Sequence, residues 1–170
     1  AAAGLLALGC ETTGHRSSTE RFGKVYYLDG AGNLGYGWDS VPPALKDAGF
    51  RGDVEIVVWT TFTGPLGDQL IQANARLRST ILTDKITKYR KLYPDTPVYV
   101  IGLSAGTGVA VWAVENLPQG VKVDRMVLFG SSLSNDYDMT KCLSHVNEDV
   151  TVFYSPRDAV LRGFIGIVPT

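Results

Sequence analysis

The chain has 170 residues, 45% hydrophobic and 19% charged, a composition that suits one packed globular domain and argues against disorder. Sixteen Lys and Arg residues nearly balance 17 Asp and Glu residues, so the net charge of -1 gives no reason to expect nucleic acid as a partner. The two cysteines and two histidines lack the spacing of a disulfide framework or a metal site, and we expect neither metal nor cofactor.

The first 20 residues differ in composition from the rest. Residues 1–9 form an apolar run shorter than the ~20 residues that span a bilayer, and Cys10 separates it from a polar stretch. Small and apolar residues before a cysteine, followed by a Ser/Thr/Gly tether, resemble the lipobox of a bacterial lipoprotein behind part of a secretory signal. This resemblance implies lipidation of Cys10 and membrane anchoring in the bacterial cell envelope. An incidental Cys10 in a cytoplasmic protein is the alternative. We therefore divide the chain into a signal and tether segment, 1–20, and a core domain, 21–170.

The core domain alternates short apolar runs with segments of helical periodicity. In chain order we predict a strand at 25–28, a glycine-rich loop at 30–37, a helix at 42–48, a strand at 54–59, a helix at 68–93, a strand at 98–101 and a helix at 105–116. Then follow a turn at 117–120, a strand at 123–129, a segment at 138–145 that is a short helix or irregular, and a strand at 150–154. Strands separated by helices or crossover loops indicate an α/β protein, a three-layer α/β/α sandwich with a mostly parallel sheet.

The most informative motif comes directly after the third predicted strand and opens a helix. Residues 102–106 read Gly-Leu-Ser-Ala-Gly, the G-x-S-x-G pattern of a sharp strand-to-helix turn that lifts a serine above the sheet. Such a turn tolerates only small neighbours, and the N-terminus of the following helix favours developing negative charge. We therefore predict that Ser104 is a nucleophile, and that Gly108 lets the helix pack closely on the sheet.

Most of the chain resembles the α/β-hydrolase superfamily of serine esterases and lipases. Residues 29–32, Asp-Gly-Ala-Gly, are similar to the family's His-Gly-x-Gly oxyanion loop, with Asp29 in place of the usual histidine. The resemblance implies that the backbone N–H groups of Ala31 and Ala105 form the oxyanion hole. It also implies that Asp158, after the fifth strand, is the acid that orients a catalytic histidine. A turn aspartate that caps the next helix is the alternative for Asp158.

The catalytic base is missing from the expected position. In this fold the chain order is Ser, Asp or Glu, then His, but no histidine follows Asp158. His145 precedes the fifth strand and His15 lies in the polar tether, so we expect neither to be catalytic. We expect instead that the C-terminal part of the fold, with its histidine, lies outside these 170 residues, and that this chain alone is inactive. A degenerate hydrolase without a histidine is the other possibility.

The predicted function is hydrolysis of a small-molecule or lipid ester, or a related acyl substrate; the sequence leaves the oligomeric state open. The aromatic residues Tyr36, Trp38, Trp59 and Phe62 either line a substrate pocket or pack in the core. One alternative is an inactive hydrolase-fold protein of the cell envelope that only binds its ligand. Another is dinucleotide binding, because residues 30–35 read G-x-G-x-x-G after a strand. No helix is predicted to start there, and no acid ends the next strand.

Overall fold

Parallel strands form the centre of the molecule, a computed structural model that describes residues 18–30, 37–59 and 68–155, without the side chains of 68–74. In these residues the strands are β1 (Lys24–Leu28), β2 (Asp53–Ile56), β3 (Val98–Leu103), β4 (Val123–Phe129) and β5 (Val146–Phe153). They form one sheet in the order β2-β1-β3-β4-β5, and every pair is parallel. The helices are α1 (Val41–Asp47), α2 (Asp68–Leu92), α3 (Gly106–Glu115) and α4 (Thr140–Leu143), and a 3-10 turn, Glu20–Phe22, precedes β1.

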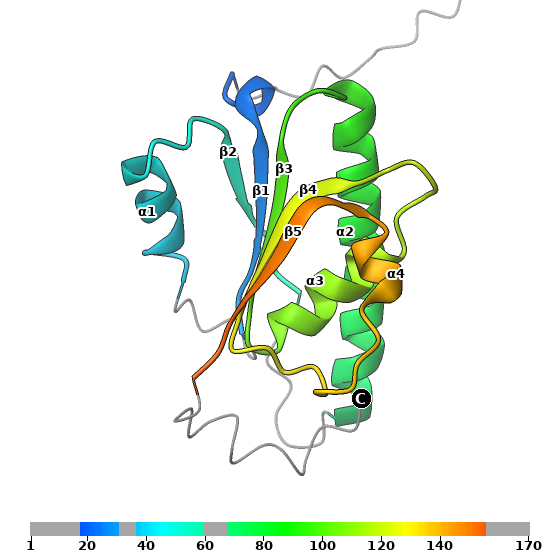
Figure 1. Cartoon of the computed structure of the whole chain (residues 1–170). Coiled ribbons are helices and arrows are strands. Elements are labelled where there is room, and N and C mark those ends of the chain that lie inside the picture. The colour runs from blue at the N-terminus through cyan, green and yellow to red at the C-terminus, as the bar shows by residue number, and fades with distance from the viewer. Residues whose placement is uncertain (1–17, 31–36, 60–67, 156–170) are drawn as a thin grey trace, which may run out of the picture.

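Helices cover both faces of this sheet (Figure 1). The larger core lies under α2, α3 and α4, where Val98 and Val100 of β3 point. The alternate residues of β3, Tyr99 and Ile101, point to the other face and pack in a second core with α1. The predicted three-layer α/β/α sandwich is therefore confirmed, and its sheet is parallel throughout the part that the structure describes.

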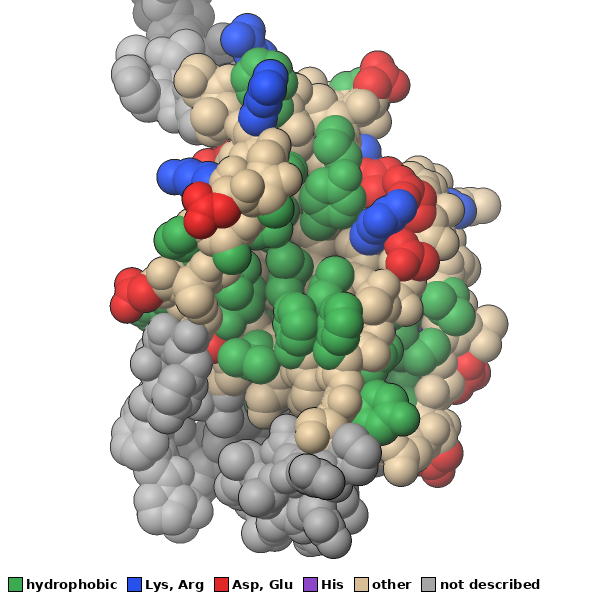
Figure 2. Space-filling model, turned by 60° about the vertical axis from the view of Figure 1, so that its left-hand side comes forward, with side chains coloured by type: hydrophobic (Ala, Val, Ile, Leu, Met, Phe, Trp, Pro, Cys, Tyr) green, Lys and Arg blue, Asp and Glu red, His purple; other side chains and the backbone are tan. Residues whose placement is uncertain are grey.

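The face that carries α1 is the less covered of the two. Figure 2 shows hydrophobic side chains gathered on it beside α1. Because Leu128 of β4 belongs to the larger core, strand alternation places Phe129 on the α1 face. Phe129 stacks on Phe153 of β5 with ring centroids 5.1 Å apart, and their exposed fractions are 37% and 53%.

β2 and β5 differ most in length from the sequence prediction, while β1 and β3 differ by one and two residues. β5 begins at Val146, before the predicted start at residue 150. Residues 147–149 are polar and exposed on the edge strand of the described sheet, so they carry no apolar pattern from which a strand is predicted. β2 ends at Ile56, although residues 57–59 are apolar. Val57 still donates its N–H to the Tyr27 carbonyl at 2.8 Å, and the chain then leaves the ladder.

The parallel register brings the carboxyl ends of four neighbouring strands together. Leu103 of β3 lies opposite Phe129 of β4, which lies opposite Phe153 of β5, and Leu28 of β1 lies opposite Gly102. The loops that follow β1, β3, β4 and β5 therefore leave from the same edge of the sheet. This edge is where ligands bind in open α/β sheets.

Asp124 connects three elements at the opposite edge of the sheet. Its Oδ2 accepts the N–H of Val98 at 2.7 Å and pairs with the Arg90 guanidinium of α2 at 2.6 Å. Its Oδ1 accepts the side-chain amide of Asn147, in β5, at 2.9 Å. Burial by itself would raise the pKa of Asp124, but the hydrogen bonds from Asn147, Val98 and Arg90 outweigh it and hold the pKa below its usual value.

Asp124→Asn should lower the free energy of unfolding by about 2 kcal/mol at neutral pH, because hydrogen bonds to a charged group are each worth roughly 1.5–3 kcal/mol. A depressed folded-state pKa stabilises the protein above the unfolded pKa of about 3.9, and this stabilisation is lost as the pH falls through the folded value. The difference between wild type and variant should therefore shrink below about pH 4. Urea titrations between pH 3 and 8 measure it.

Asp149→Asn is the matched control, because Asp149 pairs with Arg125 at 3.2 Å where both side chains are about half exposed. Exposed pairs of this kind contribute roughly 0–1 kcal/mol. Equal destabilisation by both substitutions would contradict the role assigned to Asp124.

Candidate active site

Ser104 occupies a strained turn between β3 and α3. Its φ is +50°, and it has the only positive φ of a non-glycine residue among 18–30, 37–59 and 68–155. Its N–H donates to the Phe129 carbonyl at 2.8 Å, and its carbonyl accepts the N–H of Thr107 at 2.9 Å. A left-handed serine held between a strand and a helix is the backbone geometry that G-x-S-x-G predicts. Such strain persists where surrounding structure enforces it, most often at functional sites.

Both glycines of the motif are required by close approaches of the backbone. A Cβ on Gly102 would lie 2.9 Å from the Thr107 Cα, where α3 begins. A Cβ on Gly106 would lie 2.4 Å from the carbonyl oxygen of Asp29 and 2.7 Å from that of Leu28. The first turn of α3 therefore packs directly on the end of β1, and this contact brings Ser104 to the carboxyl edge of the sheet.

The prediction for Gly108 is wrong. A Cβ on Gly108 would meet only the Leu133 Cδ2, at 3.9 Å, which is an ordinary van der Waals contact. The close approach of α3 to the sheet takes place two residues earlier, at Gly106. The sequence could not separate the two glycines, because both lie in the first turn of the same helix.

The segment that follows β1 lies beside Ser104. A Cβ on Gly30 would be 3.4 Å from the Cβ of Ser104. Asp29 is fully buried; its carboxylate accepts a hydrogen bond from the Tyr27 hydroxyl at 3.0 Å, and its carbonyl accepts the indole N–H of Trp59 at 2.7 Å. Burial, followed by the hydrogen bond to Asp29, raises the pKa of Tyr27, which keeps this phenol protonated as a donor. Asp29 thus has a structural role at the end of β1.

Of the four aromatic residues considered for a substrate pocket, two are described. Trp59 is 2% exposed and ties the end of β2 to Asp29, so it packs in the core. Trp38 is half-buried and packs in the second core with α1. Tyr36 and Phe62 lie outside the described residues. The structure therefore assigns Trp59 to packing.

The other predicted site residues divide between described and undescribed parts of the chain. Ala105 directly follows Ser104 as the N-cap residue of α3. Ala31 and Asp158 lie outside the described residues, as do Cys10 and His15, and their roles stay predictions. β5 ends at the same edge of the sheet as β4, because Gly130 after β4 donates its N–H to the carbonyl of Phe153 at 2.8 Å.

His145 lies at the opposite edge of the sheet from Ser104. Its carbonyl accepts the N–H of Val123 at 2.9 Å, and its Nδ1 lies 2.9 Å from the carbonyl oxygen of Val121. Val123 and Phe129 bound β4, and at about 3.3 Å per residue the strand separates the two edges by roughly 20 Å. Ser104 is bonded to Phe129, so His145 cannot be its base within this chain. This separation is consistent with the prediction that His145 is not catalytic.

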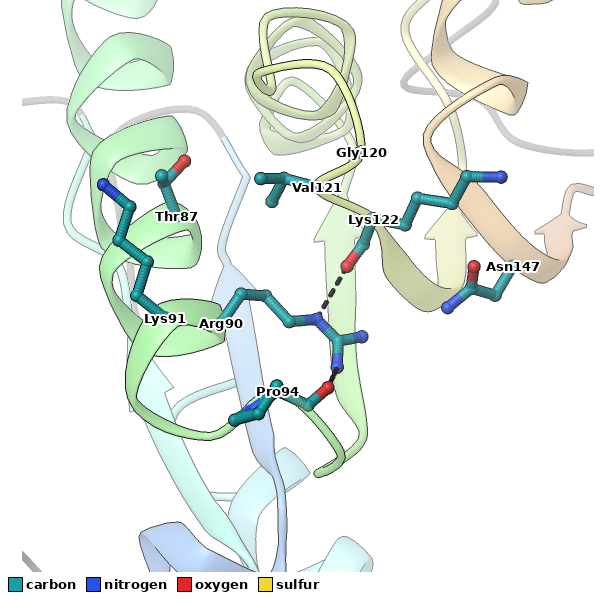
Figure 3. A pocket seen from close by; sticks show the side chains of 8 residues that line it. All are labelled: Thr87, Arg90, Lys91, Pro94, Gly120, Val121, Lys122 and Asn147. Atoms are coloured by element: carbon teal, nitrogen blue, oxygen red, sulfur yellow. Dashed lines mark hydrogen bonds between the residues drawn. The ribbon is translucent and has the colours of Figure 1, made fainter.

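A surface pocket at the same edge as His145 is built around a structural arginine (Figure 3). The Nε of Arg90 donates to the carbonyl of Lys122 at 2.7 Å, and its Nη1 donates to the carbonyls of Pro94 and Thr96. Together with the ion pair to Asp124, these bonds leave the guanidinium little capacity for a ligand. The lining residues are Thr87, Arg90, Lys91, Pro94, Gly120, Val121, Lys122 and Asn147.

A search of the described ranges for a metal centre or a membrane span gave neither. No group of three or more His, Cys, Asp or Glu residues there could hold a metal ion, and no helix there is long and apolar enough to cross a bilayer. The second cysteine, Cys142, is buried with its Sγ 3.5 Å from the Sδ of Met126, and burial raises its pKa to about 12. Its thiol is therefore unreactive in the folded protein.

Neither a protein-family model nor a curated protein matches the chain by sequence. Solved structures do match its fold. Esterase PE8 superposes with a TM-score of 0.59 at 15% identity, over 82% of this chain and 71% of that one. Trichoderma reesei cutinase, in complex with a phosphonate inhibitor, has a TM-score of 0.54 at 20% identity, over 82% of this chain and 64% of that one. An acetylxylan esterase has a TM-score of 0.55 at 12% identity, over 86% and 92%.

These likenesses confirm the α/β-hydrolase fold. The chain shares the architecture of carboxylic-ester hydrolases, and its strained Ser104 turn stands at the carboxyl edge of the sheet. In the described part, the first helix after β1 is α1, which begins at Val41. Residues 31–36, which hold most of the predicted dinucleotide-binding pattern, lie outside the described residues, so that alternative stays a prediction.

Proposed function

We propose that this protein is a serine esterase in which Ser104 attacks the carbonyl carbon of a carboxylic ester. The observation that carries the proposal is the +50° φ of Ser104 in a strand-to-helix turn beside the end of β1. The same fold carries many unrelated functions, so the strained turn at Ser104 is more specific for this function than the sheet is. The esterase names of the fold neighbours are consistent with it.

The proposed reaction has two halves. The Ser104 Oγ bonds to the ester carbonyl carbon while its proton passes to a histidine base, and the carbonyl oxygen becomes an oxyanion. The N–H groups of Ala31 and Ala105 stabilise this oxyanion, each contributing ~3 kcal/mol. The C–O bond to the alcohol then breaks as the histidine returns the proton. Water attacks the acyl-serine by the same route and releases the acid.

Asp158 orients the histidine and stabilises its imidazolium in this proposal. The described residues place no histidine close to Ser104. His145 is roughly 20 Å away by strand length, and His15 lies outside the described part. The proposal therefore requires a histidine that lies outside the described ranges, and the activity tests use the full-length protein.

A fluorophosphonate probe tests the proposal, because it phosphonylates serines only when a base activates them. We expect the complete protein in its native state to take up one probe molecule, located on Ser104 by peptide mass spectrometry. Heat-denatured protein should take up none. We also expect hydrolysis of p-nitrophenyl acetate or a longer-chain ester. An unlabelled protein without ester hydrolysis would overturn the proposal in favour of an inactive hydrolase-fold binding protein, and an adduct on another serine would reassign the nucleophile.

A further inference from the structure

We propose that Thr107 is the positioning residue that holds Ser104 in its strained turn and links it to the loop after β4. This inference rests on the proposed esterase function. Thr107 has no exposed surface and lies in the first turn of α3, three residues after Ser104. It is one of few buried polar side chains in the described part of the chain, so its hydrogen bonds must offset the free-energy cost of burying its hydroxyl.

The first set of contacts is to the turn itself. The Oγ1 of Thr107 donates to the carbonyl oxygen of Ser104 at 2.6 Å, and the Thr107 N–H donates to the same oxygen at 2.9 Å. A threonine bonding back to a carbonyl three or four residues earlier is common in helices. Here, however, the accepting carbonyl belongs to Ser104, whose backbone is left-handed. This conformation costs roughly 1–2 kcal/mol for an L-amino acid.

The second set of contacts reaches a different part of the chain. The Oγ1 of Thr107 accepts the N–H of Ser132 at 3.2 Å, and the hydroxyl of Ser131 lies 3.4 Å away as a further donor. A hydroxyl has one donor proton and two acceptor lone pairs, so this arrangement uses its whole capacity. The segment that it binds begins directly after β4, about 25 residues further along the chain.

Ser104 is therefore tied to the end of β4 through its N–H and to the loop after β4 through its carbonyl. Its own N–H bonds to Phe129, the last residue of β4, and its carbonyl connects through the Thr107 hydroxyl to Ser132. Without that hydroxyl, the Thr107 N–H would be the remaining bond to the Ser104 carbonyl, and Ser132 would lose its acceptor. The nucleophile would then sample more orientations, and a misplacement of about 1 Å can cost on the order of 100-fold in rate.

The test compares Thr107→Val, which keeps the shape and removes the hydroxyl, with Thr107→Ser, which keeps the hydroxyl. In the complete protein we expect Thr107→Val to lower kcat and the rate of fluorophosphonate labelling about 30-fold, with KM changed less than about twofold. Thr107→Ser should retain at least about a third of the wild-type kcat, since its hydroxyl can make the same bonds.

Thr83→Val is the matched control. Thr83 is also buried, and its Oγ1 lies within hydrogen-bond distance of the carbonyl oxygens of Ser79 and Ala113, at 2.9 and 2.8 Å, and shares its one proton between them. This contact ties α2 to the far end of α3. We expect a similar loss in melting temperature but an unchanged kcat. An equal fall in kcat for both valine variants, or a Thr107→Val enzyme as fast as wild type, would overturn the inference.

Amide hydrogen exchange separates this inference from the proposed function. The Ser132 amide should exchange faster in Thr107→Val than in wild type or Thr83→Val, whether or not the protein hydrolyses esters. A wild-type protein without activity or labelling would refute the esterase proposal alone. An unchanged Ser132 amide would refute the link through Thr107 even in an active enzyme.

Discussion

Ser104→Ala should abolish ester hydrolysis by the complete protein, lowering kcat at least about 10⁴-fold, while its melting temperature stays within a few degrees of wild type. The loss is large because no acyl-enzyme can form without the Oγ, and neighbouring groups do not replace a nucleophile. The fold should survive because the substitution keeps the Cβ and the backbone bonds of Ser104 to Phe129 and Thr107. Initial rates with p-nitrophenyl esters and thermal unfolding of the same preparations measure both effects.

Ser144→Ala provides the control for this prediction. Ser144 is exposed after α4 and its hydroxyl donates to the carbonyl of Lys141 at 2.7 Å, so its removal leaves the turn at Ser104 untouched. Its kcat should stay within about twofold of wild type, since surface substitutions away from special features have small effects. A Ser104→Ala protein that keeps a tenth of the activity would place the nucleophile elsewhere.

Gly106→Ala should destabilise the fold by about 3 kcal/mol, at the upper end of the costs of overpacking. Its new Cβ would lie 2.4 Å from the carbonyl oxygen of Asp29 and 2.7 Å from that of Leu28, and both obstacles are backbone atoms that no rotamer change can move. α3 would have to shift away from the end of β1. Because Ser104 and Ala105 lead directly into α3, kcat should fall as well.

Gly108→Ala separates this steric effect from helix propensity. Its Cβ would meet only the Leu133 Cδ2 at 3.9 Å, and alanine in a helix interior is favoured over glycine by up to about 1 kcal/mol. Gly108→Ala should therefore be as stable as wild type or more stable. Chemical unfolding of both variants checks the prediction. Equal stability losses at the two positions would contradict the packing of Gly106 against β1.

Local patterns predicted the elements that surround the nucleophile. The third and fourth strands are short apolar runs, and residues 102–106 join a strand to a helix with glycines at the crowded positions. The left-handed turn at Ser104 is predicted from that local order, because G-x-S-x-G between a strand and a helix is typical of a sharp, strained turn. The polar start of β5 escaped prediction because an exposed edge strand needs no apolar alternation.

The contacts between distant segments followed only from the sheet order β2-β1-β3-β4-β5, which periodicity does not contain. That order lets the Trp59 indole N–H bond to the Asp29 carbonyl. It packs Gly106, not Gly108, against β1, and it places Thr107 within hydrogen-bond distance of the Ser132 N–H. It also sends His145 to the edge away from Ser104. The sequence by itself therefore determined the α/β class and the reactive turn, which depend on neighbours along the chain. The tertiary structure decided which residues support that turn, because this depends on strands that meet across the sheet.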